Sequence, residues 1–410
     1  MNSRERVLMA LNHQEPDRVP VDFGGHRSSG IAVQAYRNLR EYLGLPKSEL
    51  FVYDVVQQLA VIEDDVYDIL GTDVLQLGYD LYKSPEFWKE WRLHDGTEIK
   101  IPKHINIQQD LHGNYFIKTP KGKQACIQKK ECLYFEQTEF PYYDSDEEEF
   151  EDLEKDLEEI MWVSVNTPFD ALPISERGER AKALRETTDK AILGAFGGGM
   201  IELGEQAFRM DNYLMELIAD RPRIERFCDQ LVKIHLRRLE RYLEEVAPYI
   251  DVILFGDDLG MQTGSQISAD MFNLVLRPRY EQEWKMIKEK APHLKIQMHC
   301  CGSIHNLLPH LIDAGLDAFN PVQISCYKME PERLKADFGK DMVFWGGGCD
   351  TGCVLSRGTP AQIKEHVKRN IDILKPDGGF VFQQVHNILA DVPPQNIVAM
   401  FEAVKEYGSY

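Results

Sequence analysis

A histidine and two cysteines follow an apolar run in the stretch Lys295-Ile-Gln-Met-His-Cys-Cys-Gly-Ser303. If a strand begins near Lys295, the alternation of its side chains places His299 and Cys301 on one face and Cys300 on the other. An imidazole and a thiolate arranged in this way can bind one metal ion between them. The alternative is a set of buried structural cysteines, because free cysteine is among the most buried residue types.

A second apolar run, residues 341–345, ends in three glycines that are followed by Cys349. One imidazole and two thiolates are a donor set typical of Zn²⁺, and three protein ligands leave the fourth position open, as catalytic zinc sites do. We therefore predict a zinc site formed by His299, Cys301 and Cys349. A purely structural zinc site or a redox-active cysteine protein is the alternative.

The apolar runs that precede these residues recur along the chain and alternate with helix-like segments. Eight runs are typical of strands, at residues 18–23, 73–77, 191–196, 252–255, 296–298, 317–322, 342–345 and 379–385. Alternating β and α units predict a parallel sheet, and eight of them predict an α/β fold of the (β/α)8 TIM-barrel type. An open doubly wound sheet is the alternative, but no Gly-x-Gly-x-x-Gly motif opens a helix after a strand.

Polar residues directly follow several of the predicted strands. In such barrels the functional side chains come from the C-terminal ends of different strands, so these residues are expected to meet at one mouth. On this ground Asp257, Asp258 and His386 are the candidate catalytic residues, which would orient the zinc ligands or bind the substrate. The alternatives are a helix cap for each aspartate and a structural hydrogen bond for the histidine.

Residues 96–137 differ from the barrel units, because short runs of β-forming residues are separated by Asp-Gly, His-Gly-Asn and Pro-Lys-Gly turn signals. The segment Asp144 to Glu159 that follows is strongly acidic and has Lys155 as its one base. We predict a single barrel domain, residues 1–410, with a β-hairpin and acidic insertion at about residues 96–160. The simplest interpretation of the acidic part is a solvated surface, and a docking surface for a partner is the alternative.

The composition limits the classes of function. A formal net charge of −20 argues against nucleic-acid binding, which needs a basic surface. No apolar run approaches the ~20 residues of a membrane-spanning helix, and the charged first residues do not resemble a signal peptide. We expect a cytoplasmic protein whose eight cysteines are reduced thiols. An oligomer is compatible with these features.

The C-terminal half resembles the uroporphyrinogen decarboxylase superfamily, and within it the zinc-dependent methyltransferases that work with corrinoid proteins. The resemblance spans residues 190–408 and is weaker at residues 16–25 and 53–78. The stretches that carry it are residues 251–260, Arg277-Pro-Arg279, His299-x-Cys301, residues 346–351 with Gly358-Thr-Pro360, and residues 385–396. His-x-Cys with a distant cysteine is the metal motif of this branch.

This resemblance implies a transferase that moves a methyl group from a small methylated substrate to the Co(I) centre of a corrinoid (cobalamin) bound by a separate partner protein. The insertion and the ending Val385-His-Asn-Ile388 resemble the O-demethylase components of anaerobic one-carbon metabolism, which act on methoxylated aromatic compounds. A methylcobalamin:thiol methyltransferase is the first alternative. A cofactor-free decarboxylase is the second, although only Arg27 remains here of the arginine-rich signature of the decarboxylases.

Overall fold

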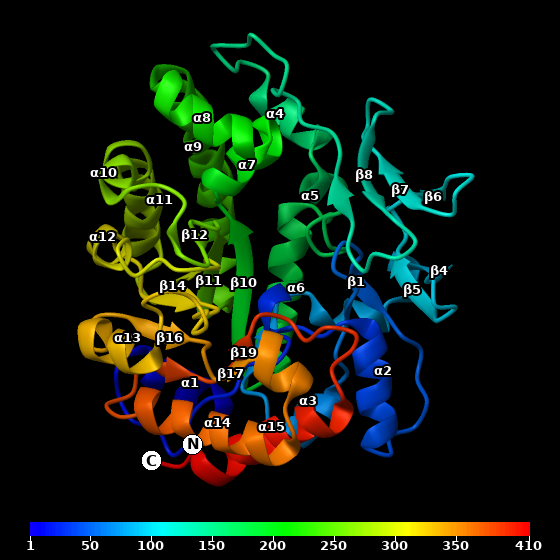
Figure 1. Cartoon of the computed structure of the whole chain (residues 1–410), viewed down its shortest axis with the longest axis vertical. Helices are drawn as coiled ribbons and strands as arrows, with labels where there is room; N and C mark the ends of the chain where they lie inside the picture. Colours follow the sequence, from blue (N-terminus) through cyan, green and yellow to red (C-terminus); the bar gives the residue numbers. More distant parts are fainter.

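A curled, seven-stranded parallel sheet forms the centre of the molecule (Figure 1). The computed structural model describes residues 1–410, apart from the side chains of Val163 and Ser164. In their order across the sheet the strands are β18 (Phe380–Val381), β16 (Val343–Trp345), β15 (Ala318–Asn320), β14 (Lys295–His299), β11 (Val252–Gly256), β10 (Ala191–Gly197) and β3 (Val74–Gln76). The predicted parallel α/β sheet is therefore confirmed.

The eighth predicted strand, residues 18–23, joins the two edges of this sheet as an irregular extended segment. On one edge the Asp22 N–H donates to the Phe382 carbonyl at 2.9 Å, and on the other the Asp73 N–H donates to the Val21 carbonyl at 2.7 Å. The segment also contacts the residue that follows α15 (Pro394–Tyr407), because the Val19 N–H donates to the Gly408 carbonyl at 2.9 Å. Pro20 lacks an N–H group and interrupts the ladder. The result is a TIM-like fold of seven regular strands and one joining segment.

Both faces of the sheet are buried, as in parallel sheets that helices cover. The inner face encloses a small apolar cluster that includes Leu193, Leu254 and Trp345, and the first helix, α1 (Ser3–Leu11), contributes Val7 and Leu11 to it. This helix begins at Asn2, whose side chain accepts the Glu5 N–H in a capping box. Helix α1 therefore closes one end of the sheet, and the candidate site lies at the other end, where the strands finish.

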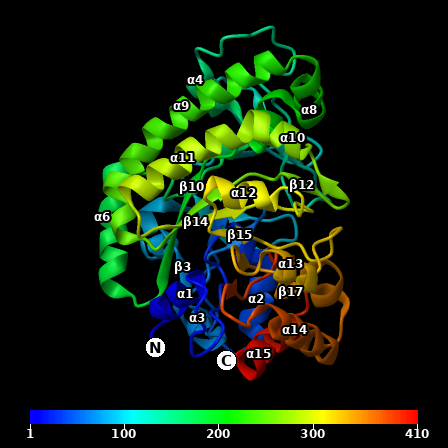
Figure 2. The same cartoon turned by 90° about the vertical axis from the view of Figure 1, so that its left-hand side faces the viewer.

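The remaining helices surround the sheet, and the long helices α9 and α11 run side by side (Figure 2). The helices of more than one turn are α2 (Val33–Tyr42), α3 (Asp64–Leu70), α6 (Ile174–Thr187), α7 (Ile201–Phe208), α8 (Met210–Ala219), α9 (Arg221–Glu245), α11 (Arg277–Lys290), α12 (Leu308–Ala314), α13 (Pro331–Phe338), α14 (Pro360–Leu374) and α15 (Pro394–Tyr407). Single turns are α4 (Leu153–Asp156), α5 (Met161–Ser164) and α10 (Ala269–Met271). Within the described part of the chain, no helix has the length and apolarity needed to cross a membrane.

The β-rich region between residues 88 and 137 forms two small antiparallel sheets beside the parallel sheet, drawn in cyan in Figure 1. They consist of the pair β4 (Trp88–Arg92) and β5 (Glu98–Pro102), and of the four strands β6 (Ile107–Gln109), β7 (Tyr115–Lys118), β8 (Gln124–Gln128) and β9 (Glu136–Gln137). Three further pairs are short: β1 (Val52–Asp54) with β2 (Leu59–Ala60), β12 (Gly260–Met261) with β13 (Gly264–Ser265), and β17 (Cys349–Asp350) with β19 (Gln384–Val385). That the β-rich region is an insertion into a single barrel domain stays a prediction.

The acidic segment, residues 144–159, lies against helix α9. The buried guanidinium of Arg223 donates to the carbonyls of Ser145 and Glu147 at 2.6 and 2.9 Å. Arg226 pairs with the Glu148 carboxylate at 2.7 Å. The backbone of this segment is therefore hydrogen-bonded to α9 and the Glu148 carboxylate is paired, while Asp144 and residues 146–149 are exposed to solvent.

Replacing Arg223 with alanine is expected to release this segment. One hydrogen bond to a charged group contributes about 1.5–3 kcal/mol, so its loss should raise the population of the detached segment roughly 10-fold or more. Cleavage by a glutamate-specific protease within residues 144–149 should accelerate by a similar factor, because proteolysis follows the population of the opened form. Arg241→Ala, at an exposed position of the same helix, is the control, and equal cleavage rates in both variants would contradict the expectation.

Candidate metal centre

Three potential metal ligands meet where strands of the parallel sheet end. His299 is the last residue of β14, and its Nε2 lies 3.4 Å from the Cys301 Sγ. His386, which follows β19 with a positive φ of 65°, joins them. One ligand atom from each of these residues lies within 4.8 Å of the other two, and all three side chains are half-buried. The cluster therefore combines two imidazoles and one thiol.

Cys349 is not a member of this cluster among the described residues. It is fully buried in β17, which pairs with β19, and β19 immediately precedes His386. Cys349 therefore lies in the strand next to the one that His386 follows. The sequence suggested Cys349 because it follows an apolar run and glycines, as His299 and Cys301 follow an apolar run. Its role as a ligand stays a prediction.

Asp258 lies beside the His299 nitrogen that faces Cys301. Its Oδ1 is 3.6 Å from the His299 Nε2 and accepts the Cys301 N–H at 2.6 Å. One carboxylate oxygen therefore contacts two members of the cluster. The role of Asp258 in orienting the ligands stays a prediction.

Asp257 has a different environment, because its carboxylate is buried and accepts hydrogen bonds from the first residues of α7. The N–H groups of Met200, Ile201 and Glu202 donate to it at 2.8, 3.0 and 2.7 Å. The Tyr280 hydroxyl also donates to it. A carboxylate at this place stabilises the positive end of the helix. These contacts correspond to the helix-capping alternative, and a catalytic role for Asp257 stays a prediction.

Two glutamates of α7 face the same mouth and were missed by sequence analysis. Burial raises the pKa of Glu202 well above its usual range, and the charges of Asp258 and Asp257 raise it further. Burial and the same two aspartates raise the pKa of Glu205 to about 8. These side chains therefore keep protons near neutral pH. Their sequence signal was the glycine run 197–199, which brings α7 close to the end of β11.

The β-rich region also contributes to the site. Tyr134 comes from the loop between β8 and β9, and its hydroxyl accepts a hydrogen bond from the Asn387 Nδ2 at 3.2 Å. The Oδ1 of Asn387 lies 2.6 Å from the His386 Nδ1. Residues 124–137 therefore help to hold a member of the metal cluster, although they are distant from it in sequence.

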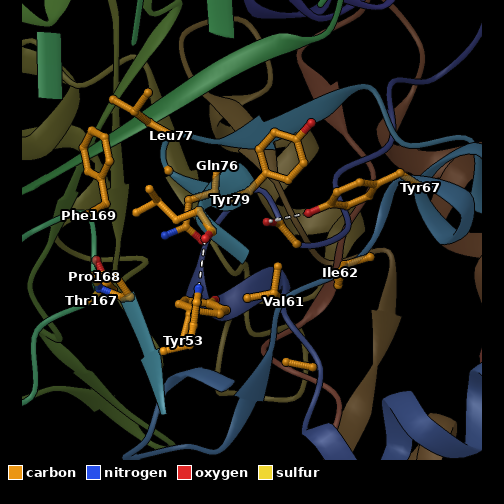
Figure 3. A pocket seen from close by; sticks show the side chains of 15 residues that line it. Tyr53, Val61, Ile62, Tyr67, Gln76, Leu77, Tyr79, Thr167, Pro168 and Phe169 are labelled. Atoms are coloured by element: carbon orange, nitrogen blue, oxygen red, sulfur yellow. Dashed lines mark hydrogen bonds between the residues drawn. The ribbon is translucent and has the colours of Figure 1, made fainter. Parts of the chain in front are cut away.

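A separate pocket lies next to the ends of the segment 18–23 and of β3, and Figure 3 shows its lining. Aromatic and aliphatic side chains form most of its wall, among them Tyr53, Ile62, Tyr67, Tyr79 and Phe169. The Tyr67 hydroxyl donates to the Gly24 carbonyl at 3.5 Å. The buried Tyr53 hydroxyl has no hydrogen-bond partner in the described part of the chain. Its cavity volume of about 30 Å³ is roughly that of one water molecule.

Comparisons with known proteins bear on both the family and the fold. A family model described as Uroporphyrinogen decarboxylase (URO-D) matches residues 146–407. Among solved structures, a methyltransferase from Methanosarcina mazei has a TM-score of 0.58 and 17% sequence identity, with 99% of each chain covered. At this identity the likeness demonstrates a shared fold. No curated protein matches the chain.

Proposed function

The chain belongs to the uroporphyrinogen decarboxylase family, and from this premise we propose that it is a zinc-dependent methyltransferase. It would move a methyl group from a small methylated substrate to the Co(I) centre of a corrinoid held by a partner protein. The observation that carries the proposal is the cluster of His299, Cys301 and His386 at the ends of the strands. The shared fold with a methyltransferase from Methanosarcina mazei supports it.

The residues of the cluster fit zinc. Imidazole nitrogens and a thiolate are the ligands that zinc prefers, and three of them leave one position for a substrate atom. When bound, zinc would supply a Lewis acid for the oxygen that leaves with the demethylated product. Cys349 is the alternative third ligand that the sequence suggested.

The chain's own residues would support such a transfer in two ways. Asp258 holds the Cys301 backbone and faces the His299 ring, so it fixes the positions of two ligands. Glu202 and Glu205 keep protons because of burial and neighbouring negative charge, and one of them would protonate the leaving oxygen. The carbon–oxygen bond would break with its electron pair on oxygen, and the electron pair of Co(I) would form the new bond to carbon.

A methoxylated aromatic compound is the substrate class that we favour. The insertion at about residues 96–160 and the ending Val385-His-Asn-Ile388 support this choice, because both resemble the O-demethylase components. The reaction would then be an O-demethylation.

The family match itself favours one other candidate, a cofactor-free decarboxylase. That chemistry requires cations for the substrate carboxylates. Arg27 is the residue in the corresponding loop, but it pairs with Asp54 at 2.7 Å and lies over the Trp162 ring at 5.2 Å. With Arg27 engaged in this way, the methyltransferase is the better-supported proposal.

The test mixes the zinc-loaded protein with reduced cobalamin and a panel of methoxylated aromatic compounds. Formation of methylcobalamin, followed by absorbance, is the expected result, and boiled protein is the control. Consumption of methylcobalamin by a thiol, with no reaction of any methoxylated donor, would favour the thiol methyltransferase. The absence of a reaction in both assays would contradict the proposal. Release of CO2 from a carboxylated substrate without a metal would favour the decarboxylase.

A further inference from the structure

Two buried amide side chains lie beside the metal cluster. Asn320 ends β15, directly opposite His299 on the neighbouring strand, and Gln383 lies between β18 and β19. Both side chains are fully buried. The Asn320 Oδ1 is 2.8 Å from the Nδ1 of His299, so this amide contacts the ring on the side opposite the cluster.

The orientation of the Asn320 amide follows from its other partners. Its second polar atom lies 2.9 Å from the backbone carbonyl of Trp345. A carbonyl can only accept, so this atom must be the NH2 group and the atom that faces His299 must be the oxygen.

Gln383 leads to the same orientation independently. Its Nε2 lies 3.1 Å from the backbone carbonyl of Gln384, so its oxygen faces Asn320 at 2.6 Å and accepts from the Asn320 NH2 group. Two carbonyl groups of the main chain therefore fix both amides.

This orientation determines where His299 carries its proton. The amide oxygen has no hydrogen to donate, so the hydrogen bond requires an N–H at Nδ1, and a neutral imidazole has one N–H. The lone pair is then on Nε2, the atom that lies 3.4 Å from the Cys301 Sγ. We propose that Asn320 is a positioning residue that holds His299 in the tautomer able to bind a metal through Nε2. This inference rests on the proposed metal centre.

The hydrogen-bond network beyond Asn320 preserves this assignment. The Gln383 oxygen lies 3.1 Å from the Nε2 of His26, which must donate to it. Burial, together with the nearby His299, lowers the pKa of His26 to about 3, so the ring is neutral. The hydrogen bonds of His26 and of the Asn320 NH2 group both end on the Gln383 oxygen. Neither bond involves the His299 ring, so the Asn320 oxygen remains the acceptor for the Nδ1 proton.

The first test observes the tautomer directly in the metal-free, full-length protein by NMR of ¹⁵N-labelled histidine. The His299 signals are assigned from the spectrum of a His299→Gln variant. The wild-type ring should carry its proton on Nδ1. Asn320→Asp keeps an acceptor at this place and should preserve that tautomer, whereas Asn320→Leu should release it. A wild-type His299 protonated on Nε2 would overturn the inference.

The second test measures zinc affinity by competition with a chelator. Loss of a residue that orients a metal-binding histidine typically weakens metal affinity 10- to 100-fold, and Asn320→Leu should show a loss of this size. Gln383→Leu should show a smaller loss, because Asn320 would keep its bond to the Trp345 carbonyl. Asn396→Leu is the matched control: Asn396 is a buried amide that donates to the Leu355 and Gly358 carbonyls, away from the cluster.

The outcomes separate this inference from the proposed function. Equal zinc affinities in Asn320→Leu and Asn396→Leu, with matched melting temperatures, would overturn the positioning role. A wild-type chain that binds no zinc would overturn both the metal centre and this inference. Zinc binding with the expected loss in Asn320→Leu, but without methyl transfer, would overturn the proposed function alone.

Discussion

Replacing Cys301 with serine is expected to abolish zinc binding and methyl transfer while the fold survives. Cys301 supplies the thiol of the cluster, and its side chain lies in a half-buried position at the mouth. The wild-type chain should hold about one zinc, with a zinc–sulfur distance near ~2.3 Å. Metal analysis and X-ray absorption of the purified protein measure both quantities. Cys300→Ser is the control, because the Cys300 Sγ instead accepts the Leu259 N–H at 3.2 Å.

The same metal analysis of two further variants identifies the third zinc ligand. His386→Ala is expected to lose the metal, since its ring belongs to the cluster, and Cys349→Ser is expected to retain it. The reverse result would confirm the ligand set that the sequence predicts, with Cys349 as the third ligand. Full zinc occupancy in Cys301→Ser would contradict the metal centre altogether.

Replacing Asp73 with alanine is expected to destabilise the protein by about 3–5 kcal/mol, the usual cost of removing one partner from a buried ion pair. The side chain is fully buried and accepts from Arg6 and Arg18, each at 2.7 Å. It also accepts the Val21 N–H at 2.9 Å. It therefore connects α1, the joining segment 18–23 and β3. Equilibrium unfolding in urea measures the change.

Asp64→Ala provides the comparison for this substitution. Asp64 pairs with Lys83 at 2.8 Å, but about half of each side chain is exposed: 53% for Asp64 and 51% for Lys83. Exposed pairs contribute about 0–1 kcal/mol, so the free energy of unfolding should change little. Similar effects of the two variants would show that the Asp73 network does not hold the joining segment.

The regular part of the fold could be predicted because apolar runs carry a strong signal. The predicted strands 252–255 and 296–298 lie within β11 and β14, whose residues are nearly all buried. Such elements are determined by local periodicity, and neighbouring parallel strands then place His299 and Asp258 at one mouth.

The remaining features depend on contacts between distant residues or on backbone turns. His386 joins the cluster from a position with positive φ, a conformation that histidine does not favour as glycine does. The arginine partners of the acidic segment could not be predicted from the sequence, because Arg223 lies more than seventy residues further along the chain. Asn320 lies near the end of a predicted strand, which placed it near the mouth, but its contact with the Trp345 carbonyl, 25 residues further along the chain, could not be predicted.

The joining segment 18–23 also has a consequence for the order in which the fold forms. It is hydrogen-bonded through Asp22 to Phe382 and through Val19 to Gly408, residues that are far from it in sequence. Pairings of such large sequence separation form slowly, because the loop between the partners must first be closed. The ring of strands is therefore expected to close late in folding, and the edge strands β3 and β18 stay open until then.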